Sequence, residues 1–234
     1  LGRLIMNATL DWLRSRGVRW ALLDATADGY PLYLSLGFVE AEPSWFGHVP
    51  LVDIRRSVLA GQAADVRVLL RESPDMRRLA TLDTAAFGGD RTGFLELVLR
   101  APGTALYVAE DASGSPSGYL IVRAIEAPYV GGRLGPWVAR DTGTAAALLA
   151  RTLGGDAPWR ASLGDVSDAD AELFVTPPGT NPHAVELLRT IGVHVVRDDV
   201  VMRLALASRG ETGEPVSIAD HPEWLYAWLA PMVF

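Results

Sequence analysis

The sequence predicts an α/β (α+β) fold in which helices and strands alternate along the chain, arranged as two units of which the first is incomplete. Apolar residues recur at helical spacing between Leu4 and Leu13. Apolar residues then alternate with others from Val18 to Leu23, as in a strand. With 234 residues, of which 49% are hydrophobic, the chain can build one or two domains of roughly 100 to 200 residues each.

The first segment continues through a short helix into further strands. Gly17 suits the end of the first helix, and the following strand ends at Asp24 in a polar loop. In the run from Tyr30 to Phe38, Pro31 suits the first turn of a short helix and Gly37 suits its end. We expect a hairpin of residues 38–45 with 48–54 to close this segment.

A second series of elements follows residues 57–67, which form either a linker or a connecting helix. Ser73 before Pro74 is a capping signal for a helix that ends at Gly88-Gly89. The remaining expected elements are a first strand at 66–70, a helix at 91–100, a hairpin of 105–109 with 118–122, a strand at 129–138, a helix at 141–153, a strand at 172–175, a short helix at 181–190, and a final pair of strands at 194–196 and 200–206.

Two segments near the end of the chain, a turn and an apolar stretch, are of interest. The final strand pair is expected to turn at Arg197-Asp198-Asp199. Residues 224–229 are too apolar for a free tail, so we expect them to pack on the rest of the protein or on a partner.

Composition excludes several classes of function. The formal net charge is −7, which argues against binding to nucleic acid. All 21 basic residues are arginine, so no lysine can form a Schiff base or contact phosphate in a P-loop. There is no cysteine, and the four histidines are scattered without ligand spacing, so no metal site is expected.

The chain has no stretch of roughly 20 apolar residues and no signal-peptide pattern near its start. We therefore expect a cytoplasmic protein without a membrane partner. Because the first residues already look like the interior of a motif, we also expect a fragment of a longer protein.

Two motifs resemble the GNAT family of N-acetyltransferases. Leu32-Tyr33-x-x-x-Gly37-Phe38, after a helix and a strand, resembles the end of the family's core, and Leu1-Gly2-Arg3 resembles the tail of its pyrophosphate motif, Q/R-x-x-G-x-G/A. Leu82-Asp83-x-x-x-Phe87-Gly88-x-Asp90-Arg91 is similar to the carboxy-terminal domain of tandem GNAT proteins of bacteria. The resemblance implies the GNAT acyl-CoA N-acyltransferase fold, a mixed central sheet flanked by helices, in two copies with the first incomplete.

The resemblance also implies roles for particular residues. Glycines and helix-start amides hold the CoA pyrophosphate in this family, which assigns Leu1, Gly2 and Arg3 to cofactor binding. Tyr33 stands where the family has the general acid, and Thr26 stands where it usually has asparagine.

In the second series, four residues match the family's pattern for cofactor binding. Arg140, Gly143 and Ala145 satisfy the pyrophosphate pattern, and Asn181 begins the family's asparagine-to-glycine spacing. Leu188, however, occupies the tyrosine's place. Asp24, Asp83, Glu110 and Asp141 are further carboxylates that could face a cleft, and none is singled out.

These expectations define a division of the chain and two functions. Residues 1–58 are assigned to the C-terminal half of a GNAT domain, 59–65 to a linker, 66–206 to a second, divergent GNAT domain and 207–234 to an apolar tail. The leading function is transfer of acetyl from acetyl-CoA to a primary amine, either a small amine or a peptide amine, without a metal. The alternative is a non-catalytic module that binds acyl-CoA or another small ligand. Little activity is expected of these 234 residues alone, and pairing as a homodimer would cover exposed apolar faces.

Overall fold

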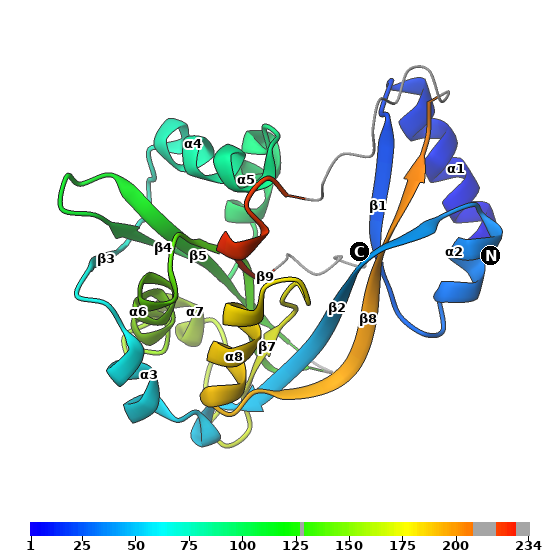
Figure 1. Cartoon of the computed structure of the whole chain (residues 1–234). Helices are drawn as coiled ribbons and strands as arrows, with labels where there is room; N and C mark the ends of the chain where they lie inside the picture. The colour runs from blue at the N-terminus through cyan, green and yellow to red at the C-terminus, as the bar shows by residue number, and fades with distance from the viewer. Residues whose placement is uncertain (127–128, 208–218, 228–234) are drawn as a thin grey trace.

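The computed structural model describes residues 1–126, 129–207 and 219–227. Their strands form one mixed sheet in the order β1-β8-β2-β7-β6-β5-β4-β3, and β9 pairs with β6 (Figure 1). The strands are β1 (Trp20–Ala25), β2 (Val39–Pro50), β3 (Arg67–Leu70), β4 (Thr104–Glu110), β5 (Pro116–Ile125), β6 (Gly131–Ala139), β7 (Glu172–Val175), β8 (His194–Ala205) and β9 (Leu225–Ala227). The α-helices are α1 (Gly2–Ser15), α2 (Tyr30–Ser35), α3 (Arg56–Gln62), α4 (Met76–Phe87), α5 (Thr92–Leu99), α6 (Thr142–Thr152), α7 (Pro158–Ala161) and α8 (Pro182–Thr190).

Helices cover both faces of the sheet. Side chains that alternate along the strands pack against α3, α6, α7 and α8 on one face, which we call the inner face. Helices α1 and α2 pack on this same face where β1 meets β8. On the opposite face, which we call the outer face, α4 and α5 cover β4 and β5.

Strands β2 and β8 hold the two ends of the sheet together. Each has 12 residues, and they pair antiparallel with register shifts along the way. The second half of β2 also pairs with β7, and the second half of β8 also pairs with β1. Figure 1 shows the two strands running side by side from the region of α8 to the region of α1. Each long strand thus connects the two ends of the sheet.

The two hairpins expected at 38–54 and at 194–206 are wrong, because each is one continuous strand. Phe46 and Gly47 stay in β2, since pairing with β8 continues through them. A Cβ atom on Gly47 would lie 2.8 Å from Trp45 Cζ3, so glycine allows this close approach. Arg197 and Asp199 stay in β8, where their side chains form a two-bond ion pair on one face instead of a turn.

Most other expected elements are present at or near the expected residues. Gly17 and Gly37 follow their helices with φ angles of 71° and 91°. The expected first strand is β3, and the segment left open between linker and helix contains α3. The cap of α4 is Asp75 rather than Ser73, because the Asp75 carboxylate accepts hydrogen bonds from Arg77 N and Arg78 N.

The order helix, strand, short helix, long strand occurs twice in the chain. It appears as α1-β1-α2-β2 and again as α6-β7-α8-β8, where the second run has the additional short helix α7 between α6 and β7. Gly37 and Gly192, which precede the two long strands, both have positive φ angles. Within the described ranges, no helix has the length and apolar character needed to cross a bilayer.

Candidate functional site

The start of α1 leaves backbone donors without partners. Leu1 is the N-cap residue and makes no side-chain capping bond. Its carbonyl accepts hydrogen bonds from Leu4 N and Ile5 N at 3.0 and 3.2 Å. The amides of Gly2 and Arg3 have no acceptor among the described residues. The first turn of a helix carries partial positive charge, so this end favours an anion.

The start of α1 also touches α2. Arg3 Nη2 donates to Ser35 Oγ at 2.7 Å, and a Cβ atom on Gly2 would lie 3.6 Å from Leu32 Cδ2. Gly2 and Arg3, two of the residues assigned to the cofactor, therefore lie beside the helix that carries Tyr33.

Tyr33 is half-buried on α2. Its ring packs edge-on against Phe38, with 5.9 Å between ring centroids. The ring also covers Gly29, where a Cβ atom would come within 2.8 Å of Tyr33 Cε2. No hydrogen bond ties the Tyr33 hydroxyl to a described residue. The proton of this phenol is therefore not committed to another group.

Thr26 shapes the turn that leads into α2. Its hydroxyl accepts from Gly29 N at 3.3 Å, and its carbonyl accepts from Tyr30 N at 2.9 Å. Thr26 thus positions α2, and through α2 it positions Tyr33. Leu1, Gly2, Arg3, Thr26 and Tyr33 belong to one group on α1, α2 and the turn before α2.

Asp24 lies at the end of β1, on the outer face of the sheet. Ser44 Oγ donates to its carboxylate at 2.7 Å. The pKa of Asp24 is raised, chiefly because burial disfavours the charged form and then because Asp199 is close. Hydrogen bonding from Ser44 and the charges of Arg197 and Arg133 oppose this rise.

The other three carboxylates considered from the sequence are occupied by structural contacts. Asp83 accepts two bonds from Arg91 and one from Tyr119, and Glu110 pairs with Arg71. Asp141 caps α6, accepting from Thr144 N and Thr144 Oγ1 at 2.8 Å each. Of the four, Asp24 is the one that neither caps a helix nor pairs with an arginine.

The start of α6 has a side-chain cap, which the start of α1 lacks. The Asp141 carboxylate occupies the place where the first turn would receive an anion. A Cβ atom on Gly143 would lie 2.9 Å from Ala64 Cβ, and Ala64 N donates to Gly143 O at 2.9 Å. Arg140 is exposed, with its guanidinium 5.5 Å from the ring centre of Trp224, and Ala145 is fully buried.

Asn181 is fully buried and fully bonded. Its carbonyl oxygen caps α8, accepting from His183 N and Ala184 N at 3.0 and 3.1 Å. Its amide nitrogen donates to Glu223 O at 2.9 Å and to Leu225 O at 2.8 Å. The Asn181 side chain therefore holds the segment that forms β9.

Strand β9 occupies the edge of β6 next to α6. The parallel strands β6 and β7 pair only over residues 131–133 and 172–174. Further along, β6 pairs with β9 instead. Tyr226 of β9 packs on Trp137, with ring centroids 5.3 Å apart, and its hydroxyl lies 3.2 Å from Thr142 Oγ1. The edge between β6 and α8 is thus filled by the chain itself.

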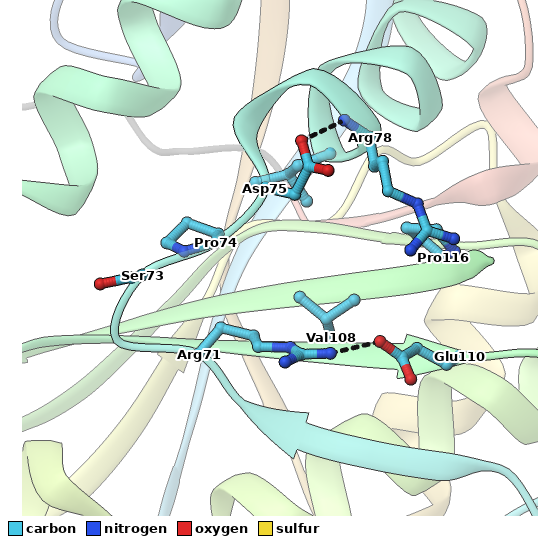
Figure 2. Close-up of a pocket in the computed structure, with 9 residues that line it drawn as sticks. Arg71, Ser73, Pro74, Asp75, Arg78, Val108, Glu110 and Pro116 are labelled. Atoms are coloured by element: carbon cyan, nitrogen blue, oxygen red, sulfur yellow. Dashed lines mark hydrogen bonds and ion pairs between the residues drawn. The ribbon is translucent and has the colours of Figure 1, made fainter. Parts of the chain in front are cut away.

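A pocket of about 260 Å³ lies between α4 and the ends of β3 and β4 (Figure 2). Its polar groups bind one another. Arg71 pairs with Glu110, Asp75 caps α4, and Arg78 Nη2 donates to Gly114 O at 2.6 Å. Because these groups are already paired, the pocket carries no catalytic assignment.

Sequence reasoning missed Ser44 and Arg133 as candidate functional residues. Both lie on the outer face of the sheet, as Asp24 does. Arg133 is the charged residue in the otherwise apolar strand β6, and that contrast was a usable signal. Ser44 offered no such signal, because its contact with Asp24 joins two strands that are not neighbours in the sheet.

The mixed sheet flanked by helices, with this repeated element order, defines an α/β protein of the acyltransferase type. The family model described as an acetyltransferase (GNAT) domain matches residues 79–213. The chain therefore belongs to the GNAT acetyltransferase family. No protein with curated function matches the chain.

Solved structures share this fold at low sequence identity. A putative acetyltransferase from Pyrococcus horikoshii has a TM-score of 0.69 and 22% identity, covering 98% of this chain and 65% of its own. A tandem GNAT protein from the clavulanic acid biosynthesis pathway has a TM-score of 0.58 and 15% identity, with coverages of 88% and 70%. A GCN5-related N-acetyltransferase from Kribbella flavida has a TM-score of 0.55 and 18% identity, with coverages of 88% and 48%. The chain thus spans less than two thirds of the Pyrococcus and Kribbella chains.

Proposed function

We propose that this chain belongs to an N-acetyltransferase that transfers the acetyl group of acetyl-CoA to a primary amine. The observation that carries the proposal is the contact between the start of α1 and the helix bearing Tyr33, in a chain of the GNAT family. The acceptor is a small amine or a peptide amine. The division into two GNAT copies, the first incomplete, is part of this proposal and is supported by the repeated element order.

The residues at the start of α1 fit a CoA diphosphate. The free amides of Gly2 and Arg3 offer hydrogen bonds, and the helix dipole favours the negative charge. The Arg3 guanidinium adds a positive charge and keeps donors beyond its bond to Ser35. Acetyl-CoA supplies the activated acetyl group, and these residues would hold its diphosphate.

Tyr33 and Asp24 are placed on opposite sides of β1. Asp24 lies on the outer face, whereas α2 packs on the inner face. In the proposed reaction the amine nitrogen attacks the thioester carbonyl carbon, and the carbon–sulfur bond breaks. Asp24 takes a proton from the attacking amine, and Tyr33 gives its proton to the leaving thiolate. The raised pKa makes Asp24 a better base than an ordinary carboxylate.

A non-catalytic role is favoured for the second unit, residues 66–206. Its pyrophosphate pattern lies at a helix start already capped by Asp141, and Asn181 is committed to α8 and β9. Leu188, in the place of the tyrosine, is fully buried. Strand β9 lies along β6, where a ligand held at α6 would extend. We propose that this unit supports the first one and does not bind acetyl-CoA.

The first unit exposes apolar surface that needs cover. Leu4 and Trp12 on α1 are 72% and 54% exposed, and Leu22 on β1 is 50% exposed. Among the described strands, β1 lies at the end of the sheet with β8 as its neighbour. Further strands or a second copy of the chain would cover this surface. We propose that these 234 residues alone have little activity.

Replacing Tyr33 with phenylalanine tests the catalytic part of the proposal. In the full-length protein, Tyr33→Phe is expected to lower kcat by about 10²-fold, because general acid catalysis contributes roughly 10²- to 10⁴-fold. The KM for acetyl-CoA should stay within about twofold. Steady-state kinetics over a panel of amines measures both constants.

Tyr30 on the same helix provides the matched control. Its hydroxyl donates to Glu40, so Tyr30→Phe removes a similar phenol without touching the proposed acid. We expect kcat to be nearly unchanged in that variant. Equal kcat values for Tyr33→Phe and the unmodified protein would show that Tyr33 is not the acid.

A further inference from the structure

Arg133 is a half-buried cation with few partners. A guanidinium has five N–H donors. In the described part of the chain, Arg133 makes one hydrogen bond, from Nη2 to Thr176 Oγ1, at 3.5 Å. Its pKa is lowered, chiefly by burial and then by the charges of Arg123 and Arg197. A buried charge with so few partners is costly unless a ligand completes its bonding.

Two further arginines raise the positive charge around Arg133. Arg123 on β5 lies directly opposite Arg133 on β6, and like charges in this arrangement repel. Arg197 lies on β8, and its positive charge also acts on Arg133. The guanidinium groups of Arg133 and Arg197 both lie over the ring of Phe46, at 5.5 and 5.2 Å from its centre.

The neighbouring carboxylates do not balance these charges. Arg197 is satisfied by Asp199, with bonds of 2.6 and 2.8 Å. Asp24 has a raised pKa and accepts its side-chain bond from Ser44, not from Arg133. Of Arg133 and Arg197, Arg133 is therefore the one whose donors remain available among the described residues.

Aromatic side chains surround this charge on the outer face. Phe46 stacks on Phe174 with 6.0 Å between centroids, and Tyr129 packs edge-on against Phe174 at 5.6 Å. A planar guanidinium beside aromatic rings suits a small ligand with an apolar part and an anionic group that takes two hydrogen bonds.

We infer that Arg133 binds an anionic group of the acceptor, a carboxylate or a phosphate, so that the acceptor is an amine that also carries a negative charge. This inference rests on the proposed function. It assigns the anion to the acceptor because Arg133 and Asp24 share the outer face, whereas α1, the proposed diphosphate site, packs on the inner face. An anion on Arg133 would hold the acceptor on the same face as its proposed base.

The test follows the Arg133 Nε–H signal by NMR in the full-length protein while sodium acetate or inorganic phosphate is added. The signal is identified by its loss in Arg133→Met. Arg100, the C-cap residue of α5, has a side chain that is 78% exposed and is the reference for non-specific binding. We expect the Arg133 signal to saturate at a concentration at least about tenfold lower than the Arg100 signal, because a charge-assisted bond in a buried site is worth about 1.5 kcal/mol or more.

The two anions separate the sources of the ligand. Tighter saturation by acetate indicates a carboxylate-bearing amine, and tighter saturation by phosphate indicates a phosphate-bearing one. Parallel shifts of Arg133 and Arg100 with both anions would overturn the inference, since they indicate an adventitious ion only. The measurement needs neither CoA nor turnover, so its failure is distinct from failure of the Tyr33 test.

The stability of Arg133→Met separates binding from a structural role. Without added anion, methionine should leave the melting temperature equal or higher, because it removes a poorly paired buried charge and keeps the side-chain volume. A lower melting temperature would show that Arg133 serves the fold and would overturn the inference.

Discussion

At the scale of single residues, the carboxylate of Asp24 is half-buried with a serine hydroxyl as its hydrogen-bond donor. Arginines lie near it but pair elsewhere or make few bonds, so the charged form is only partly compensated. This state is useful for a base that must accept a proton from an amine. It costs stability at neutral pH.

Asp24→Asn is predicted to change how stability depends on pH. The folded pKa of Asp24 lies above the ordinary value of 3.8, so the folded protein binds more protons than the unfolded chain just above that pH. The contribution of Asp24 to the stability of the unmodified protein should therefore fall as the pH rises from about 3.8 through the folded pKa. Asparagine removes this loss and can still accept from Ser44.

Urea unfolding at several pH values between 4 and 7 measures the effect. The difference between the free energy of unfolding of Asp24→Asn and that of the unmodified protein should increase in favour of the variant as the pH rises. Asp28→Asn, at an exposed position in the next turn, is the control and should show no such trend. A difference that stays constant over this interval would contradict the prediction.

At the scale of elements, Asn181 joins α8 to β9 through four hydrogen bonds. Asn181→Ala should lower the free energy of unfolding by about 3 kcal/mol, because the variant loses a helix cap and leaves buried carbonyls without donors. Urea unfolding measures this loss. Asn7→Ala, exposed on α1, should change it by less than about 0.5 kcal/mol.

Asn181→Asp separates the two contacts. Aspartate keeps the capping oxygen for α8 but cannot donate to Glu223 O and Leu225 O. It should therefore lose stability through β9 alone. If both Asn181 variants were as stable as the unmodified protein, β9 would not be held in the way described.

Element boundaries were predictable from sequence where the signal is local. Gly17, Gly37 and Gly88 have left-handed φ angles that end helices whatever the rest of the fold does. The long strands were not predictable. Arg197-Asp198-Asp199 looks like a turn, but its partner is β2, some 150 residues earlier in the chain, as the pairing of Phe46 with Arg197 shows. Long-range pairing overrode local turn preference.

At the scale of the whole molecule, β2 and β8 connect the two ends of the sheet. The group at the start of α1 was predictable, because its residues are close in sequence and match a family pattern. The closure of α6 was not, because Asp141, Ala64 and Tyr226 come from distant segments. The same pattern therefore has an open helix start in one place and a closed one in the other.

The most direct test of this account is a calorimetric titration of the full-length protein with CoA, comparing Arg3→Glu with Arg140→Glu. Both place a carboxylate at the start of a helix, where an acidic residue is compatible with folding. The account predicts one CoA per chain, at least about tenfold weaker binding for Arg3→Glu and unchanged binding for Arg140→Glu, tenfold corresponding to about 1.4 kcal/mol. Two CoA molecules per chain, or a loss with Arg140→Glu and none with Arg3→Glu, would contradict it.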